Sequence, residues 1–153
     1  MRAIVAMDMN RVIGYKGEIP WHIPEDFKWF KKMTMGQHLI MGRTTYKSVG
    51  ILPGRFTYIL TNNAEKLKLP YANACGYIDY NTLNFLDLRP DRMWVCGGAK
   101  TYQLLLPHCT DVYVTLVLDE YKGDTYMPEF ESKFPNSEII KETRDYWIIR
   151  YWK

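Results

Sequence analysis

Five short apolar runs, each bounded by turn residues, restrict the fold of this chain more than any other feature. They are AIVAM at 3–7, HLIM at 38–41, FTYIL at 56–60, MWVC at 93–96 and VYVTLVL at 112–118. Runs that are apolar at nearly every position are typical of strands buried on both faces, as in a parallel sheet. Helical patterns lie between them, at 24–34, 43–48 and 99–106, with a weak candidate near 82–88. This alternation predicts an α/β fold with right-handed crossovers.

The pattern changes near the carboxyl end. The segments SEIIKET at 137–143 and YWIIRYW at 146–152 are predicted to be two strands joined by a tight turn at Arg144–Asp145. The sheet is therefore expected to be mixed, mostly parallel and antiparallel at its end. A chain of 153 residues suits one compact domain, so we expect residues 1–153 to form a single domain.

Composition and charge exclude several classes of function. The net charge is only +3, and the basic residues are scattered, which argues against nucleic acid but allows a small anionic ligand. No segment approaches the roughly 20 apolar residues of a membrane helix. Three cysteines without CxxC spacing make a disulfide framework or a metal site improbable. The apolar run at the start of the chain ends at Asp8 and is too short for a secretory signal. We therefore expect a soluble protein of the cytoplasm.

A long segment with little pattern, from Asp8 to Trp21, separates the first strand from the first helix. It contains Gly14, Gly17 and Pro20. Loops of this length inside compact domains are often functional lids. We expect a mobile cover over a site, although a merely long surface connection explains the same pattern.

Asp26 lies on the apolar face of the predicted helix at 24–34. On a helical wheel it aligns with Phe30 and Met33, flanked by Ile23 and Phe27, while the lysines point elsewhere. Desolvation raises the pKa of such a carboxyl, whereas the positive end of the helix lowers it. The alternative is that Asp26 only caps the first turn of the helix, as acids there commonly do.

Two predicted strands run into glycines that precede helices. Gly97 and Gly98 precede the helix that starts at Ala99, and Gly42 precedes Arg43. Such turns let phosphate groups approach backbone amides, so two of them suit a dinucleotide. The nearby cations Arg43 and Lys100 favour NADPH, whose ribose carries a 2′-phosphate. Simple steric turns and solvated surface cations remain alternative explanations.

A series of motifs in a fixed order then suggests a family. The motifs are NRVIG at 10–14, PW at 20–21, PEDFKWFK at 24–31, IMGRTTYKSVG at 40–50, LPGR at 52–55, CGGAKTY at 96–102, LP at 106–107, YVT at 113–115 and GDT at 123–125. With them the chain resembles the dihydrofolate reductase family over essentially its full length. The resemblance implies a mostly parallel eight-stranded sheet flanked by about four helices, with antiparallel strands at the carboxyl end.

The resemblance also implies the reaction and the substrate pocket. The substrate would be 7,8-dihydrofolate, reduced by hydride transfer from NADPH to C6 of the pterin while N5 acquires a proton. Asp26 corresponds to the acid that bonds the pterin, with Trp21 and Thr115 organising water and orienting the acid. Arg55 corresponds to the arginine that binds the substrate's glutamate carboxylate. The other substrate residues would be Ile4, Val5, Phe27, Phe30, Val49, Leu52 and Cys96. Core packing explains many of the apolar positions equally well.

The same resemblance implies a cofactor site and a gating residue. The cofactor residues would be Ala6, Ile13, Gly14, Ile19, Gly42, Arg43, Thr44, Thr45, Thr61, Asn62, Asn63, Cys96, Gly97, Gly98, Ala99, Lys100, Thr101 and Tyr102. Asp124 corresponds to a residue that supports the closing loop from a neighbouring loop. Cys96 departs from the usual Ile or Val. A monomer that binds antifolate inhibitors is implied, with no metal.

Two other functions fit parts of the sequence. The pyrimidine reductase of riboflavin biosynthesis shares the fold and NADPH, but it would not require PEDFKWFK and LPGR at these spacings. A non-catalytic binding or structural module could retain the fold, although Asp26, Trp21 and Arg55 are intact. Turnover distinguishes the module from both enzymes.

Overall fold

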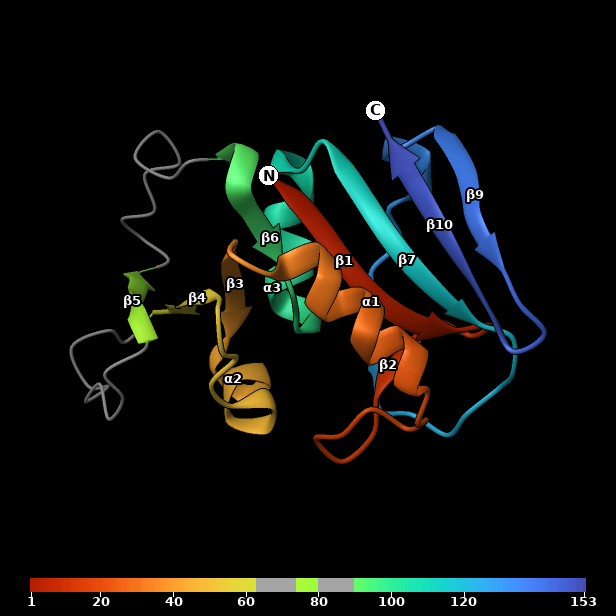
Figure 1. Cartoon of the computed structure of the whole chain (residues 1–153), viewed down its shortest axis with the longest axis horizontal. Helices are drawn as coiled ribbons and strands as arrows, with labels where there is room; N and C mark the ends of the chain where they lie inside the picture. The colour runs from red at the N-terminus through yellow and green to blue at the C-terminus, as the bar shows by residue number, and fades with distance from the viewer. Residues whose placement is uncertain (63–73, 80–89) are drawn as a thin grey trace.

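The structure is a computed structural model and describes residues 1–62, 74–79 and 90–153 (Figure 1). Its main sheet has eight strands in the order β5-β4-β3-β6-β1-β7-β10-β9. The strands are β1 Arg2–Asp8, β3 His38–Gly42, β4 Phe56–Thr61, β5 Ala74–Asp79, β6 Met93–Val95, β7 Asp111–Val117, β9 Asn136–Glu142 and β10 Tyr146–Trp152. The five apolar runs therefore form strands of one sheet, and no strand end differs from the predicted one by more than one residue.

Strand direction follows the expected pattern. The pairs β1·β6, β1·β7, β3·β6, β3·β4 and β4·β5 are all parallel. Strand β10 is antiparallel to both β7 and β9. The prediction of a mostly parallel sheet with antiparallel strands at the carboxyl end is confirmed. Strand β1 lies between β6 and β7, so the first strand of the sequence is central in space.

Three α-helices lie within the described residues: α1 Pro24–Thr34, α2 Arg43–Val49 and α3 Ala99–Leu105. Short 3₁₀ turns occur at Pro90–Arg92, Leu106–His108 and Glu131–Lys133. All three helices confirm predicted segments. The weak candidate near 82–88 lies outside the described residues. In Figure 1, α1 crosses in front of the sheet and α3 lies behind it.

Two apolar clusters form on opposite faces of the sheet, because successive strand residues point to opposite sides. Val5 belongs to a cluster that includes Tyr102 and Leu105 of α3. Its neighbour Ile4 belongs to a cluster with Tyr46 of α2, against which Trp29 and Phe30 of α1 pack. Helices α1 and α2 therefore cover one face, and α3 covers the other.

Three strands were not predicted. Strand β2 (Val12–Gly14) lies inside the long segment from Asp8 to Trp21 and pairs antiparallel with β8 (Thr125–Tyr126) in a separate sheet. Strand β5 also had no predicted counterpart. Strands of two or three residues are too short to show a periodic pattern, and their pairing partner is distant in sequence. The expected loop is thus partly a strand.

Among the residues that the structure describes, no helix combines the length and apolar character needed to cross a membrane.

Candidate active site

The centre of the candidate site is a carboxyl group paired with a hydroxyl. Asp26 lies in the first turn of α1, which begins at Pro24, and Thr115 lies near the end of β7. The Thr115 hydroxyl donates a 2.6 Å hydrogen bond to Oδ1 of Asp26. The side chain of Asp26 thus reaches across to the sheet, which favours a site over a simple helix cap. The lysines Lys28, Lys31 and Lys32 of the same helix are exposed, as the helical wheel predicted.

The surroundings of Asp26 disfavour its charge. Burial raises the pKa of Asp26 above its ordinary value of 3.8, and the hydrogen bond from Thr115 opposes part of that rise. Desolvation therefore prevails over the groups that stabilise the carboxylate. A carboxyl group with a raised pKa in an apolar pocket is a common feature of sites that move protons.

Several predicted substrate residues share the apolar cluster beside this acid. Ile4 is buried in it, and Phe30, Leu52 and Cys96 pack against it. Trp29 and Met33 of α1 also pack there, and of these the helical wheel identified only Met33. The structure thus brings together residues from β1, α1, the loop after α2 and the end of β6.

Three other predicted substrate residues lie elsewhere. Val5 packs in the cluster on the opposite face of the sheet, so its side chain is not among this group. Phe27 is 49% exposed and Val49 is 44% exposed, and the ring of Phe27 lies 5.9 Å from that of His22. Phe27 is therefore outside the apolar face that the helical wheel assigned to it.

Cys96 follows the last residue of β6 and lies at the edge of the apolar cluster. Its thiol is 3.6 Å from the carbonyl oxygen of Trp94. Burial raises the pKa of this thiol far above its ordinary value, only partly offset by the positive charge of Arg55. The thiol is thus neutral, and it acts as a small apolar wall rather than as a nucleophile.

Trp21 lies near the end of β7. It is buried in a third cluster with Val12 and Val117, and Ala6 and Ile23 pack against that cluster. The ring centroid of Trp21 lies 5.3 Å from that of Tyr121. The tryptophan, which ends the long segment before α1, is therefore packed between Val12 of the same segment and Val117 at the end of β7.

Arg55 lies in the loop that joins α2 to β4. Its Nε donates to the carbonyl of Pro53 at 3.0 Å, and its NH1 lies 3.4 Å from the Thr34 hydroxyl at the end of α1. Partial burial lowers the pKa of Arg55. Arg55 is half-buried, so part of the residue remains accessible to an anion.

The two glycine turns are in direct contact. The amide of Gly42 donates a 2.8 Å hydrogen bond to the carbonyl of Gly97. A Cβ on Gly42 would lie 3.0 Å from Oγ1 of Thr101, and one on Gly98 would lie 3.2 Å from Oγ1 of Thr45. A side chain at either position would therefore require the neighbouring threonine to shift by a few tenths of an ångström, so glycine suits this close approach. The bond between Gly97 and Gly98 is a cis peptide.

The polar groups around these turns suit phosphate. Neither α2 nor α3 has an acidic residue in its first turn. Arg43, Thr44 and Lys100 are exposed beside the turns. Strands β3 and β6 are parallel neighbours, so both turns lie at the edge formed by the carboxyl ends of the strands, where α/β sheets bind nucleotides.

Asp124 contacts the long segment that precedes α1. Its amide donates to the carbonyl of Gly14 at 3.0 Å, and its Oδ2 accepts from the amide of Lys16 at 3.0 Å. The Lys16 hydrogen bond is the main cause that lowers the pKa of Asp124. On the other side, the Ser48 hydroxyl of α2 donates to the carbonyl of Gly17 at 2.9 Å. We call residues 8–21 the closing loop.

The remaining predicted cofactor residues are spread around this region. Ile13 packs at the edge of one core cluster, and Ile19 of the closing loop is 48% exposed. Thr61 ends β4 and Asn62 follows it at the surface. Asn63 lies outside the described residues.

In the ranges 1–62, 74–79 and 90–153, no three His, Cys, Asp or Glu side chains gather in a group that could hold a metal ion.

Sequence reasoning missed two polar contacts near the site. The hydroxyl of Tyr102 donates a buried 2.6 Å hydrogen bond to the carbonyl of Ile4, linking α3 to the strand that lines the pocket. Burial raises the pKa of Tyr102 well above its ordinary value, so the hydroxyl remains a donor.

The second contact is that of Asp8, at the end of β1. Asp8 is fully buried and accepts hydrogen bonds from several backbone amides. A charged residue that ends an apolar run was the available signal for Asp8.

Comparison with known proteins connects this geometry to a family. The family model described as Dihydrofolate reductase matches residues 1–146. Dihydrofolate reductase of Bacillus subtilis is 38% identical over 160 aligned residues, covering 98% of this chain and 92% of that protein. The Staphylococcus aureus (strain MSSA476) enzyme is 31% identical over 128 residues, covering 83% and 77%.

A solved structure is similar to this chain in fold. Dihydrofolate reductase from Enterococcus faecalis, complexed with NADP(H) and RAB-propyl, aligns with a TM-score of 0.74 and 27% sequence identity. The alignment covers 99% of this chain and 94% of that one. Because the family model, the relatives and the solved structure agree over nearly the whole length, the chain belongs to the dihydrofolate reductase family.

Proposed function

We propose that this chain reduces 7,8-dihydrofolate to 5,6,7,8-tetrahydrofolate with NADPH as the reductant. The observation that carries the proposal is the Asp26 carboxyl, held by Thr115 beside the apolar cluster that contains Ile4. A flat heterocycle with adjacent N–H donors needs an acceptor pair of this kind and an apolar surface for its ring. The family membership of the chain supports the same reaction.

Asp26 would act on the substrate through its two oxygens. Since Thr115 already donates to Oδ1, the carboxylate is oriented and both oxygens retain lone pairs for the pterin amino group and N3. A negative charge at this position favours protonated states of the ring, and this assists the arrival of a proton at N5. The cofactor supplies the hydride that C6 receives. Trp21, buried at the end of the pocket, would order the water that carries the proton.

The substrate's other half would lie between the apolar residues and Arg55. Phe30, Leu52 and Cys96 would contact the pterin and aminobenzoyl rings, with Phe27 and Val49 at the exposed rim. Arg55 would bind the glutamate carboxylate through its accessible guanidinium, a charge-assisted contact. Antifolate inhibitors with the same heterocyclic donors would occupy this pocket.

The cofactor would lie along the two glycine turns. The first-turn amides of α2 and α3, which have no partner inside their helices, and the hydroxyls of Thr45 and Thr101 beside the glycines would offer donors that fit phosphate groups. Arg43 and Lys100 would neutralise phosphate charge. The other cofactor contacts would come from Ala6, Ile13, Gly14, Ile19, Thr44, Thr61, Asn62, Asn63, Ala99 and Tyr102.

Asp124 would gate the site through the closing loop. Its contacts with Gly14 and Lys16 support a closed arrangement of that loop, and Ser48 contacts the loop from α2. Loop closure excludes water and often limits turnover without touching the chemistry. We also propose that the protein acts as a single-domain monomer in the cytoplasm, on small molecules rather than on nucleic acid or membranes.

The test is the loss of reduced-nicotinamide absorbance when the protein is mixed with NADPH and 7,8-dihydrofolate, with methotrexate added to a duplicate. Rapid loss that methotrexate abolishes is the expected result. If folded protein shows no loss, the reductase assignment is wrong. Activity on a ribosylated aminopyrimidine would then identify the riboflavin-pathway reaction, and binding of both ligands without turnover would identify a non-catalytic module.

A further inference from the structure

Asp8 is a fully buried carboxylate that the proposed chemistry does not use. It is the last residue of β1 and is 0% exposed. Its Oδ1 accepts hydrogen bonds from the amides of Asn10 and Val12, both at 2.8 Å, and its Oδ2 accepts one from the amide of Tyr121 at 2.8 Å. A buried charge is costly unless such bonds compensate it. All three of these donors are backbone groups.

These three amides belong to two segments that are far apart in sequence. Asn10 and Val12 are at the beginning of the closing loop, and Tyr121 follows β7 on the way to Asp124. A backbone hydrogen bond of 3.2 Å from the amide of Met9 to the carbonyl of Asp119 lies alongside. The single side chain of Asp8 therefore joins the beginning of the closing loop to the segment that carries Asp124.

The far end of the closing loop meets the same segment. Trp21 packs on the ring of Tyr121, at a centroid distance of 5.3 Å. The amide that Asp8 binds and the ring that Trp21 contacts therefore belong to one residue. Both ends of the closing loop are fixed on Tyr121, one through its backbone and the other through its side chain.

Further bonds hold the first half of the loop. Arg11 pairs with Glu131 at 2.6 Å, and its Nε donates to the carbonyl of Met127 at 2.9 Å. Beyond Lys16, the hydrogen bonds of the loop are local or exposed. Tyr15 and Glu18 bond mainly to each other, and Ser48 makes an exposed bond to Gly17. The anchored part thus ends near Lys16, and residues 17–20 form the tip.

We propose that Asp8 is a positioning residue for the closing loop, which it fixes to Tyr121 so that only the tip at 17–20 moves over the cofactor. This inference rests on the proposed function. In this arrangement the loop loses less conformational freedom when it closes, because its first half is already ordered. Without Asp8 the closed arrangement is less populated, and hydride transfer is slower for that reason.

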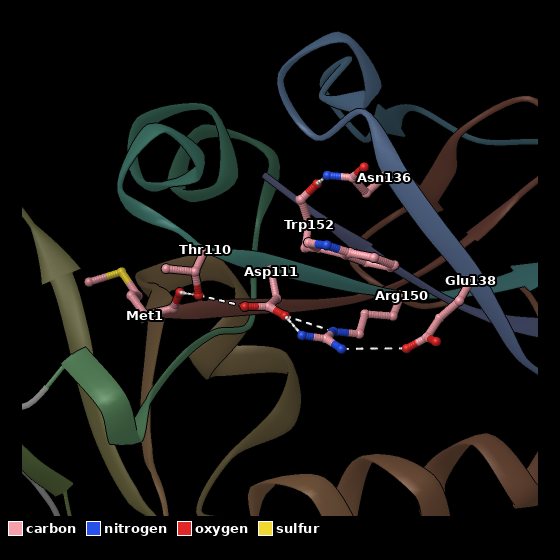
Figure 2. Close-up of polar contacts among 7 residues, drawn as sticks. All are labelled: Met1, Thr110, Asp111, Asn136, Glu138, Arg150 and Trp152. Carbon is pink, nitrogen blue, oxygen red and sulfur yellow. Dashed lines mark hydrogen bonds and ion pairs between the residues drawn. The ribbon is translucent and has the colours of Figure 1, made fainter.

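The chain provides a matched control in Asp111, a buried carboxylate near the opposite end of the β1·β7 pair. Figure 2 shows Asp111 bonded to Thr110 and Arg150, with Arg150 also reaching Glu138. Asp111 is held by a hydroxyl donor and by an ion pair with Arg150 instead of by backbone amides, and neither partner belongs to the closing loop. Asp111→Asn therefore measures how the loss of a buried carboxylate affects the stability of the fold without altering any contact of the closing loop.

The kinetic experiment compares Asp8→Asn with Asp111→Asn in the full chain. An Asn side chain has one acceptor oxygen, so it cannot satisfy all three amides. We expect Asp8→Asn to lower kcat/KM for NADPH about tenfold, the equivalent of one lost charge-assisted bond. We also expect a larger deuterium isotope effect on kcat with deuterated NADPH, because hydride transfer becomes more rate-limiting. Asp111→Asn should keep the isotope effect of the unaltered protein. Equal isotope effects in all three proteins would overturn the proposal.

A second measurement needs no variant and no substrate. In amide hydrogen exchange of the unaltered protein, Val12 and Tyr121 should be protected both with and without NADPH, whereas the amides of Gly17 and Ile19 should gain protection only with NADPH. Fast exchange at Val12 or Tyr121 without NADPH would contradict the anchor. Failure of the proposed function is recognised separately, by the absence of dihydrofolate-dependent NADPH oxidation in the unaltered protein.

Discussion

The hydroxyl of Thr115 and the carboxylate of Asp26 are joined by a 2.6 Å hydrogen bond between β7 and the first turn of α1. This bond links two segments that are distant in sequence, and it fixes the orientation of the carboxyl group that we assign to the pterin. Burial raises the pKa of that group, while Thr115 lowers it. Both halves of this relationship can be tested.

Removing the charge should separate chemistry from cofactor binding. We expect Asp26→Asn to lower turnover about a hundredfold or more at neutral pH, in the range of general acid and base catalysis. The loss should be smaller at low pH, where the substrate arrives protonated. NADPH affinity should be unchanged, because the glycine turns lie on other strands. Steady-state rates from acidic to neutral pH and NADPH titration provide the measurement, and unchanged turnover would remove Asp26 from its assigned role.

Removing the hydroxyl should raise the pKa of Asp26 further. In Thr115→Val the carboxylate loses a donor that stabilises its charged form, so protonation becomes easier. Because the folded-state pKa is already above the ordinary value of 3.8, the free energy of unfolding should rise as pH falls through the folded-state pKa toward 3.8. In the variant this rise should begin at higher pH. Carboxyl carbon NMR and denaturant unfolding against pH measure the two effects. A pKa that falls in the variant would show that Thr115 does not donate to the carboxylate.

Arg55 should discriminate between substrates with and without a glutamate. Lysine keeps the charge but loses the planar pair of donors, so Arg55→Lys should raise KM for 7,8-dihydrofolate about tenfold or more. A dihydropterin that lacks the glutamate should be reduced equally well by both proteins. Parallel kinetics with the two substrates provide the check. An equal loss with both would assign Arg55 to the architecture of the pocket instead.

The ion pair between Arg11 and Glu131 should make stability depend on pH. Burial opposes ionisation of Glu131, but the hydrogen bonds from Arg11 and from the amide of Phe130 prevail and hold its pKa below 4.5. Its contribution is therefore present above 4.5 and is lost as pH falls through the lowered folded-state pKa. Since both side chains are about one-third exposed, Glu131→Gln should cost only about 1 kcal/mol or less at neutral pH.

The measurement for this pair is the denaturant midpoint at neutral and acidic pH. The difference between Glu131→Gln and the unaltered protein should shrink in acid. A difference that stays constant with pH would show that the ion pair contributes nothing to stability.

The sequence predicted the parts of the fold that have a local signal. Buried strands such as 38–41 and 112–118 are continuous apolar runs, and α1 was indicated by Pro24 together with its periodic apolar face. Strands β2 and β8 were missed because each is short and exists only through pairing with the other. The two glycine turns were predicted individually, but their contact through Gly42 and Gly97 is a property of the parallel register.

The site shows the same division. Asp26 was identified from its helical face, and Thr115 only through the resemblance to a family. Side-chain direction was harder, since Phe27 is exposed and Val5 faces the other side of the sheet. The contacts of Asp8 with Tyr121 could not be predicted, because nothing local in either segment indicates the other.

The position of β1 between β6 and β7 has a consequence for how the protein is made. A ribosome releases Asp26 early, but the strand neighbours of β1, at Met93–Val95 and Asp111–Val117, emerge much later. The central strand cannot be paired on both sides until then, and non-local pairing of this kind is slow. Thr115 is released within the last of these segments. If Thr115 belongs to the pterin pocket as proposed, a chain whose synthesis has not passed β7 lacks the complete pocket. An antifolate that fits the proposed pocket would then stabilise only chains whose synthesis has passed β7.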